Sequence, residues 1–184
     1  MMQERHQKYI ALLRGINVGG HNKIPMAELR SLCAQIGLQN TESYIQSGNL
    51  VFSSAGISGE LEDGLEQAIH QRFGFSVPVI VRSARQWRSI AANNPFPGIS
   101  DKSPNLVMLG LCKGIPSVDS GQKLLDYAKL NERVELVDNH LWIHFSNGVG
   151  RSKITPAVLD RIAGSVVTMR NWRTVQKLKE CCVH

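Results

Sequence analysis

Asparagine occurs together with glycine, arginine or both at four places in this chain, each next to the end of an apolar or strand-like stretch. The first cluster follows residues 9–13 and reads Arg14-Gly15-Ile16-Asn17-Val18-Gly19-Gly20. The others are residues 46–49, 147–153 and 168–174. Glycine permits a left-handed backbone or close approach to a ligand, and arginine supplies a planar fork of donors. This chemistry is suited to holding negative charge.

The four clusters predict one site for a small anionic ligand, phosphorylated or carboxylated and including nucleotides, shared between the two halves of the chain. Glycine-rich turns present successive N–H groups, and helix N-termini carry partial positive charge. The predicted ligand-binding residues are Arg14, Gly15, Asn17, Gly19, Gln46, Ser47, Asn49, Arg151, Ser152, Lys153, Arg170 and Asn171.

The same clusters do not predict a reaction. They contain no Asp or Glu, so a two-carboxylate mechanism would need residues from elsewhere. Ser47, Ser152, His21 and Lys153 are the available nucleophiles or proton carriers, but no base partner can be assigned to them. The spacing Gly-x-x-x-x-Gly-Lys-Ser/Thr is missing, so no nucleotide-triphosphate loop is predicted. Catalytic residues and cofactors are therefore unassigned.

Structural interpretations of the clusters stay open beside the functional one. Ser47 and Gly48 suit the turn of a β-hairpin. Asn171 is explained by capping a helix, and Trp172 by packing. The charged side chains are also compatible with a solvated surface.

The composition of this 184-residue chain is that of a globular protein, with 42% hydrophobic and 20% charged residues. A net charge of +6 favours acidic partners. The polar N-terminus and the lack of a long apolar segment predict a cytoplasmic protein without a membrane partner. The four cysteines form no Cys-x-x-Cys pair, and His140 and His144 lie in a strand-like stretch, so free thiols and no metal site are expected.

Hydrophobic periodicity predicts that the first half has the element order strand, helix, strand, strand, helix, strand. The expected ranges are 8–14, 26–36, 41–45, 50–53, 58–73 with Ser58 as the cap, and 77–81. The proline in this last strand suggests either an edge position or the start of a strand. That order is the split βαβ, or ferredoxin-like, arrangement. A helix capped by Ser83 follows, and the Pro-rich residues 94–104 are predicted to form a linker.

The second half repeats the order. A strand at 106–111 and a helix at 118–129 precede a hairpin of 134–137 and 141–145. Thr155 and Pro156 then cap and open a helix that ends at Gly164, followed by a strand at 166–169 and a last helix capped by Asn171. The predicted fold is α+β, with two tandem ferredoxin-like subdomains, residues 1–97 and 98–184, plus a C-terminal helix.

Five motifs in order resemble a known bacterial family, the domain-of-unknown-function family 1697 (DUF1697). They are residues 13–20, 44–49, Asn94-Pro95-Phe96, 150–153 and 170–174, so the resemblance covers about residues 9–178. It implies two α+β subdomains related to the ferredoxin-like fold and assigns no activity. The motif positions correspond to the twelve predicted ligand-binding residues. His21 and Ser146 depart from the family pattern, in which lysine and proline are common.

Two further functions are compatible with the sequence. The charge and topology invite comparison with RNA-recognition modules, which stack bases on aromatic residues of the central strands. The expected central strands, 10–13 and 106–111, contain no aromatic residue. A structural or interaction protein with purely architectural loops is the third hypothesis. The oligomeric state is not predicted.

Overall fold

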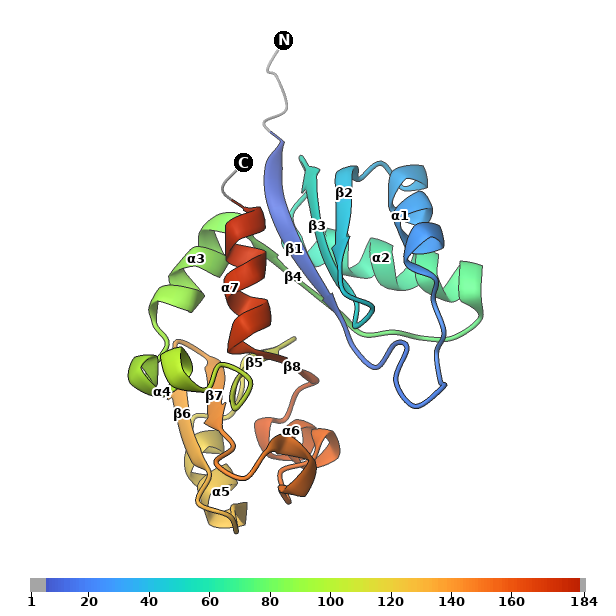
Figure 1. Cartoon of the computed structure of the whole chain (residues 1–184). Coiled ribbons are helices and arrows are strands. Elements are labelled where there is room, and N and C mark those ends of the chain that lie inside the picture. Colours follow the sequence, from blue (N-terminus) through green and yellow to red (C-terminus); the bar gives the residue numbers. More distant parts are fainter. Residues whose placement is uncertain (1–5, 183–184) are drawn as a thin grey trace. The chain divides into compact units, whose positions relative to one another are not determined.

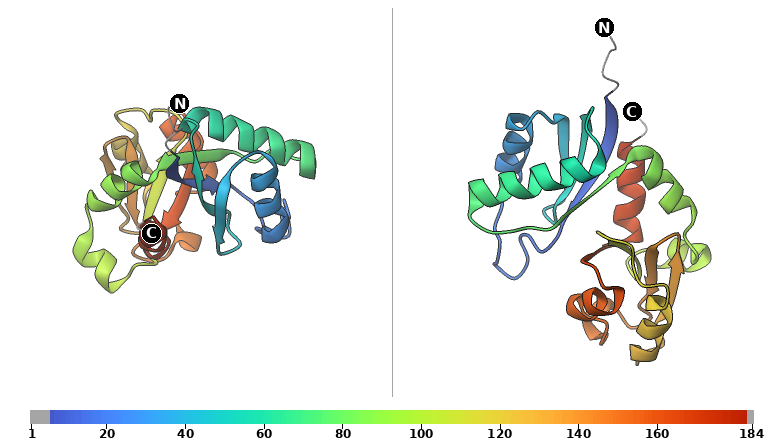
Figure 2. Two further views of the ribbon diagram at one scale, coloured as in Figure 1. Left: turned by 90° about the horizontal axis from the view of Figure 1, so that it is seen from above. Right: turned by 180° about the vertical axis from the view of Figure 1, so that it is seen from behind.

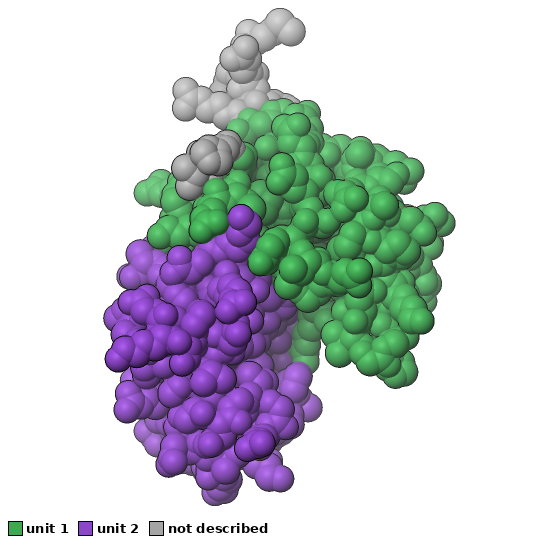
Figure 3. Space-filling model, in the orientation of Figure 1, with its two compact units in different colours: residues 1–88, 178–184 green, residues 89–177 purple. Residues whose placement is uncertain are grey.

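The computed structural model describes residues 6–182, and these residues form two compact units (Figure 3). Of these residues, 6–88 and 178–182 form unit 1, and 89–177 form unit 2. The chain passes from one unit to the other within helix α3 (Ala84–Ala92) and again within α7 (Trp172–Cys181). The domain boundary drawn after residue 97 stays a prediction.

Unit 1 has the predicted element order (Figure 1). Its antiparallel sheet has the strand order β2-β3-β1-β4. Helices α1 and α2 pack on one face of the sheet, and α2 lies across the strands (Figure 2). The elements are β1 (Gln7–Leu13), α1 (Met26–Gln35), β2 (Gln39–Tyr44), β3 (Asn49–Ser54), α2 (Ser58–Phe73) and β4 (Val79–Ser83).

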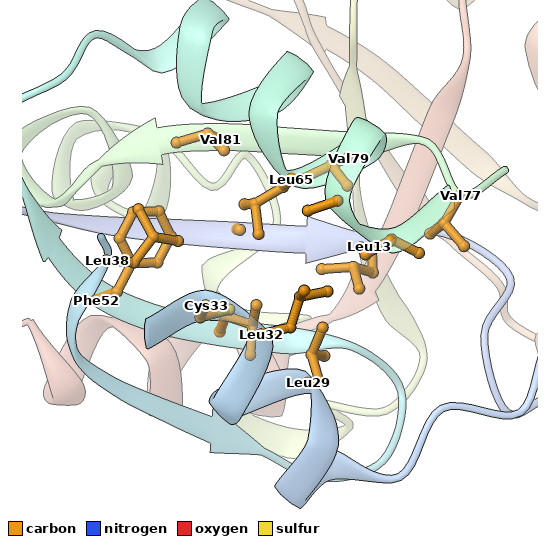
Figure 4. Packing of buried hydrophobic residues seen from close by; sticks show 14 of the residues in the cluster. Leu13, Leu29, Leu32, Cys33, Leu38, Phe52, Leu65, Val77, Val79 and Val81 are labelled. Carbon is orange, nitrogen blue, oxygen red and sulfur yellow. The ribbon is translucent and has the colours of Figure 1, made fainter. Parts of the chain in front are cut away.

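The core of unit 1 lies between the sheet and these two helices (Figure 4). Alternate residues of β1, β3 and β4 point toward the helices, because successive side chains of a strand face opposite sides. Leu13, Phe52 and Val79 meet Leu29 and Leu65 from α1 and α2 there. Burying side chains of this size stabilises the fold by roughly 1.5–3 kcal/mol each. The loops at the end of β1 are thus attached to a rigid layer.

Unit 2 repeats this topology with the strand order β6-β7-β5-β8. β5 pairs antiparallel with β7 and β8, as β1 pairs with β3 and β4. A second core, which includes Leu141, Phe145 and Leu159, fills one face of this sheet. The elements are β5 (Val107–Cys112), α5 (Ser120–Tyr127), β6 (Arg133–Val137), β7 (His140–His144), a 3₁₀ turn (Val149–Arg151), α6 (Pro156–Ala163) and β8 (Val167–Asn171). The α+β, ferredoxin-like prediction is confirmed in both units.

The two units also protect their edge strands in the same way. The backbone N–H of Val79 in β4 donates to Glu66 Oε1 of α2, and that of Val167 in β8 donates to Asp160 Oδ1 of α6, each at 2.8 Å. Both valines occupy the same register position, opposite the last residue of β1 or β5. An unpaired edge N–H is a template for unwanted pairing, and here a carboxylate accepts it.

Helix capping follows the sequence at three of the four predicted positions. Ser83 Oγ accepts from the Gln86 N–H at 3.2 Å, Thr155 Oγ1 from Val158 at 3.3 Å, and Asn171 Oδ1 from Thr174 at 2.9 Å. The prediction for Ser58 is wrong, since the N-cap of α2 is Ile57, which makes no side-chain cap bond.

The Pro-rich segment predicted as a linker contains helix α4 (Pro97–Lys102). Proline is favoured in the first turn of a helix, where its missing N–H is not needed, so Pro97 starts this helix. The buried hydroxyl of Ser100 is held by Asn94, whose Nδ2 donates to Ser100 Oγ at 2.7 Å. Composition alone misidentified an ordered segment.

The interior strands of the two sheets contain aromatic residues outside 10–13 and 106–111, the two segments in which none was found. Tyr9 lies in β1, Phe52 in β3 and Trp142 in β7. All three side chains are buried. Nucleic-acid binding stays a prediction, without an exposed aromatic residue on these interior strands to support it.

Candidate functional site

Asn17 is the residue that shapes the β1–α1 loop. Its Nδ2 donates to the carbonyl oxygens of Ile24 at 3.0 Å and Gln46 at 2.9 Å, and its Oδ1 accepts from the Ile24 N–H at 2.9 Å. Asn22 Nδ2 in turn donates to the Gly15 carbonyl at 3.1 Å. Asparagine tolerates the left-handed backbone found at position 17, where φ is 55°. One side chain therefore connects the glycine loop to the β2–β3 turn.

The β2–β3 turn is held just as tightly against the end of β1. Asn49, fully buried, donates from Nδ2 to the Tyr44 carbonyl and to Ser47 Oγ, both at 3.0 Å. The Leu13 N–H donates to the Gly48 carbonyl at 2.8 Å. Ile45, exposed at the turn, has φ of 51°, a left-handed conformation that is costly for a β-branched residue. The turn chemistry expected of Ser47 and Gly48 is present.

An open pocket of about 520 Å³ lies where these two loops meet the start of α1. That volume is within the range of small-molecule sites. All of its lining belongs to unit 1. The lining residues are Asn17, Gly20, Lys23, Ile24, Pro25, Met26, Ala27 and Gln46.

Three features give this pocket a positive character. Lys23 is exposed and, within residues 6–182, has no hydrogen-bond or ion-pair partner. The N-cap of α1 is Pro25, which offers no side-chain acceptor to the first N–H groups of the helix. Those groups carry the positive end of the helix dipole. The acidic residue in the first turn of α1, Glu28, makes an ion pair with Arg72 at 3.0 Å, so its negative charge is paired with a cation.

Only two of the twelve predicted residues, Asn17 and Gln46, line this pocket. Arg14 belongs to the same loop and is half-buried; its backbone N–H donates to the Pro78 carbonyl at 3.0 Å. Gly15 and Gly19 shape the loop, with φ of 70° and 57°. Gly20 belongs to the motif but was not among the twelve predicted residues, and Lys23, three residues beyond the motif, was not predicted either.

In unit 2, the cluster at residues 150–153 is organised by a carboxylate that sequence reasoning also missed. Ser152 Oγ donates to Glu132 Oε1 at 2.5 Å and accepts from the Ile154 N–H at 3.1 Å. Glu132 Oε2 accepts from the Leu130 N–H at 2.7 Å. Glu132 is buried, which raises its pKa, but these hydrogen bonds outweigh burial and the pKa is lowered overall. The clusters themselves contain no Asp or Glu, and this carboxylate comes from outside them.

The Ser152–Glu132 contact explains order at this loop better than it explains catalysis. The hydroxyl is engaged on both sides, and the carboxylate is held in its charged form by its donors. Arg151 and Lys153, on either side of Ser152, are exposed. They stay predicted anion contacts.

Arg170 and Asn171 end strand β8 and start α7. Burial lowers the pKa of Arg170 to about 10, and its Nη1 donates to the Met169 carbonyl at 2.8 Å. Arg82 in β4 makes the equivalent bond to the Val81 carbonyl, also at 2.8 Å. Asn171 is the cap of α7. This recurrence in both units points to a structural role for the Arg170 and Asn171 pair.

The β1–α1 loop has a counterpart in unit 2 that is closed differently. Lys113-Gly114 follows β5 as Arg14-Gly15 follows β1, and the Lys113 N–H donates to the Val166 carbonyl at 2.9 Å as Arg14 does to Pro78. Ser165 Oγ accepts from the Gly114 N–H at 2.8 Å. No described residue supplies an acceptor to the Gly15 N–H. Within the described residues, the loop N–H that is bound in unit 2 is therefore without an acceptor in unit 1.

Cysteine and metal chemistry have little support in residues 6–182. Cys33, Cys112, Cys181 and Cys182 form no disulfide with one another, and burial raises the pKa of Cys33 to about 12. No cluster of three or more potential metal-ligating side chains occurs in this part of the chain. None of the described helices is long and apolar enough to span a bilayer.

One family profile, described as a protein of unknown function, DUF1697, matches residues 6–142, which contain three of the five motifs. The chain belongs to the DUF1697 family. Among solved structures it is similar to the conserved bacterial protein SP0830 from Streptococcus pneumoniae, with 24% identity and a TM-score of 0.72 over 97% of this chain and 99% of that one. At this identity the likeness shows the fold. No match is found among curated proteins.

Two of the predicted clusters belong to unit 1 and two to unit 2, and each is described within its own unit. That all four line one pocket stays a prediction.

Proposed function

We propose that this DUF1697 protein binds a small phosphorylated or carboxylated molecule, with the anionic group held in the unit 1 pocket between the β1–α1 loop, the β2–β3 turn and the start of α1. The observation that carries the proposal is the pairing of an unpartnered Lys23 with a helix N-terminus that has no side-chain cap.

The electrostatic argument rests on what is missing from the pocket lining. No Asp or Glu is among the eight lining residues, so an anion would meet no repulsion from them. Backbone N–H groups at the start of a helix and a lysine ammonium act as donors to phosphate or carboxylate oxygens. The amide of Gln46 adds a neutral group that can donate to or accept from the rest of the ligand.

The pocket is also rigid in the way that binding requires. Asn17 joins both loops through three hydrogen bonds, and Asn49 fixes the turn that presents Gln46. A site ordered before binding loses less conformational entropy when the ligand arrives. The asparagines of the motif therefore support the pocket, and Lys23 and the α1 amides contact the anion.

Phosphate titration of the full chain tests the proposal. With a Kd of about 1 mM, 10 mM phosphate would stabilise the folded protein by about 1.4 kcal/mol, because ligand binding adds RT ln(1 + [L]/Kd). That corresponds to a rise in Tm of roughly 3–6 °C for a protein of this size. Chloride at equal ionic strength provides the reference.

The decisive comparison is Lys23→Met against Lys179→Met, an exposed lysine of α7 outside the pocket. Losing one charge-assisted contact costs about 1.5–3 kcal/mol, so Lys23→Met should weaken phosphate binding about tenfold or more. Lys179→Met should bind as the wild type does. An equal response of both variants, or none in the wild type, contradicts the proposal.

A further inference from the structure

A second pocket, of about 490 Å³, lies in unit 2 and is lined mainly by the Asn94-Pro95-Phe96 motif and helix α4. It is independent of the glycine loops, and the proposed function does not use it. The lining residues that matter are Pro95, Phe96, Pro97, Ile99, Lys102 and Arg133.

The floor of this pocket is apolar and fixed in place. Proline restricts φ at positions 95 and 97. Asn94 Oδ1 accepts from the Phe96 N–H at 2.8 Å, and the Phe96 carbonyl accepts from the Ser100 N–H at 2.9 Å. The Phe96 ring packs with its centroid 6.4 Å from that of His144. The motif thus builds a rigid apolar floor, in which Phe96 is mostly buried.

The rim carries two cations. Lys102 and Arg133 are exposed, and within residues 6–182 no carboxylate lies in ion-pair range of either. Surface lysines are common, but here two cations without a carboxylate partner line the same apolar pocket. The cations suit the charged group of an amphipathic anion, and the apolar lining suits its body. Exposed cations of this kind attract a ligand of opposite charge, and the attraction weakens as salt is added.

We propose that this unit 2 pocket binds a small amphipathic anion, with an aromatic or aliphatic body packed on Pro95, Phe96 and Ile99 and a carboxylate or sulfonate between Lys102 and Arg133. The volume fits a drug-sized molecule.

Fluorescence titration with 1-anilinonaphthalene-8-sulfonate tests both halves of this proposal, with uncharged N-phenyl-1-naphthylamine as the comparison probe. The native protein should bind the sulfonate in a saturable manner. The double variant Lys102→Met and Arg133→Met should raise its Kd at least tenfold and leave the Kd of the uncharged probe within about twofold. Lys129→Met, an exposed lysine of unit 2 outside the pocket, serves as the control.

Gly98→Leu provides a variant that fills the pocket without disturbing the core. A Cβ at Gly98 would meet nothing within 4 Å, and the same is true of Gly59 in α2, so Gly59→Leu is the matched control. Gly98→Leu should raise the Kd of both probes, and Gly59→Leu should change neither. Unchanged sulfonate binding in Gly98→Leu, or an equal loss of both probes in the charge variant, overturns the proposal.

Discussion

Replacing Gly48 with alanine tests how closely the β2–β3 turn is pressed against the end of β1. Gly48 has φ of +78°, and an added Cβ would lie 2.7 Å from Leu13 Cβ and 2.9 Å from Ile16 Cδ1. Carbon atoms pack best at about 3.5–4.0 Å. The left-handed backbone costs alanine about 1–2 kcal/mol, and overpacking a core costs about 1–3 kcal/mol. Gly48→Ala should therefore destabilise the protein by about 2–5 kcal/mol.

Gly74→Ala separates the two contributions. Gly74 ends α2 with φ of +80°, but a Cβ there would meet nothing within 4 Å. This variant should lose only the backbone contribution, about 1–2 kcal/mol. Urea unfolding followed by circular dichroism measures both free energies at matched m values. The reasoning is refuted if Gly48→Ala costs no more than Gly74→Ala.

Three more predictions concern side chains that hold the loops or face a charge. Asn17→Ala should lower the free energy of unfolding by about 2 kcal/mol, because it leaves polar groups of both loops without partners; an unchanged urea midpoint would refute this. Ser152→Ala should raise the pKa of Glu132, which is lowered in the folded protein. The stability that a lowered pKa gives is present above the pKa of the unfolded state and is lost as pH falls through the pKa of the folded state. Below about pH 4.5 the wild type should therefore lose more stability than Ser152→Ala, as acid titration would show. The pKa of His144 is lowered by burial and, second, by the charge of Arg133. NMR titration of Arg133→Gln should therefore find a higher pKa for His144, and this variant should lose less stability than the wild type as pH falls below about 6.5. An unchanged pKa would show that burial acts alone.

The fold could be predicted because its signals are local. Thr155, Pro156 and Gly164 delimit α6 as expected, with a side-chain cap at one end and a left-handed residue at the other. Apolar periodicity located every strand to within about two residues, because each sheet buries a face on its helices. Pro97 shows the limit, since composition cannot separate a proline that opens a helix from one that interrupts structure.

The candidate sites were predicted less completely because their parts are not local. Glu132 reaches Ser152 across twenty residues of sequence, and neither position carries a motif that links them. Asn17 was identified as a ligand contact, but its three hydrogen bonds go to the protein itself. The motif loop borders a pocket, and our proposal assigns the anion contacts there to Lys23 and the start of α1, a role that stays a prediction.

Amide NMR during a phosphate titration tests the central claim most directly. If the unit 1 pocket holds an anion, the N–H signals of Gly20, Lys23, Met26 and Ala27 should shift together and saturate, and Lys23→Met should raise the phosphate concentration at half-saturation about tenfold or more. Shifts that do not saturate, that occur away from these residues or that saturate at the same phosphate concentration in Lys23→Met would contradict the account.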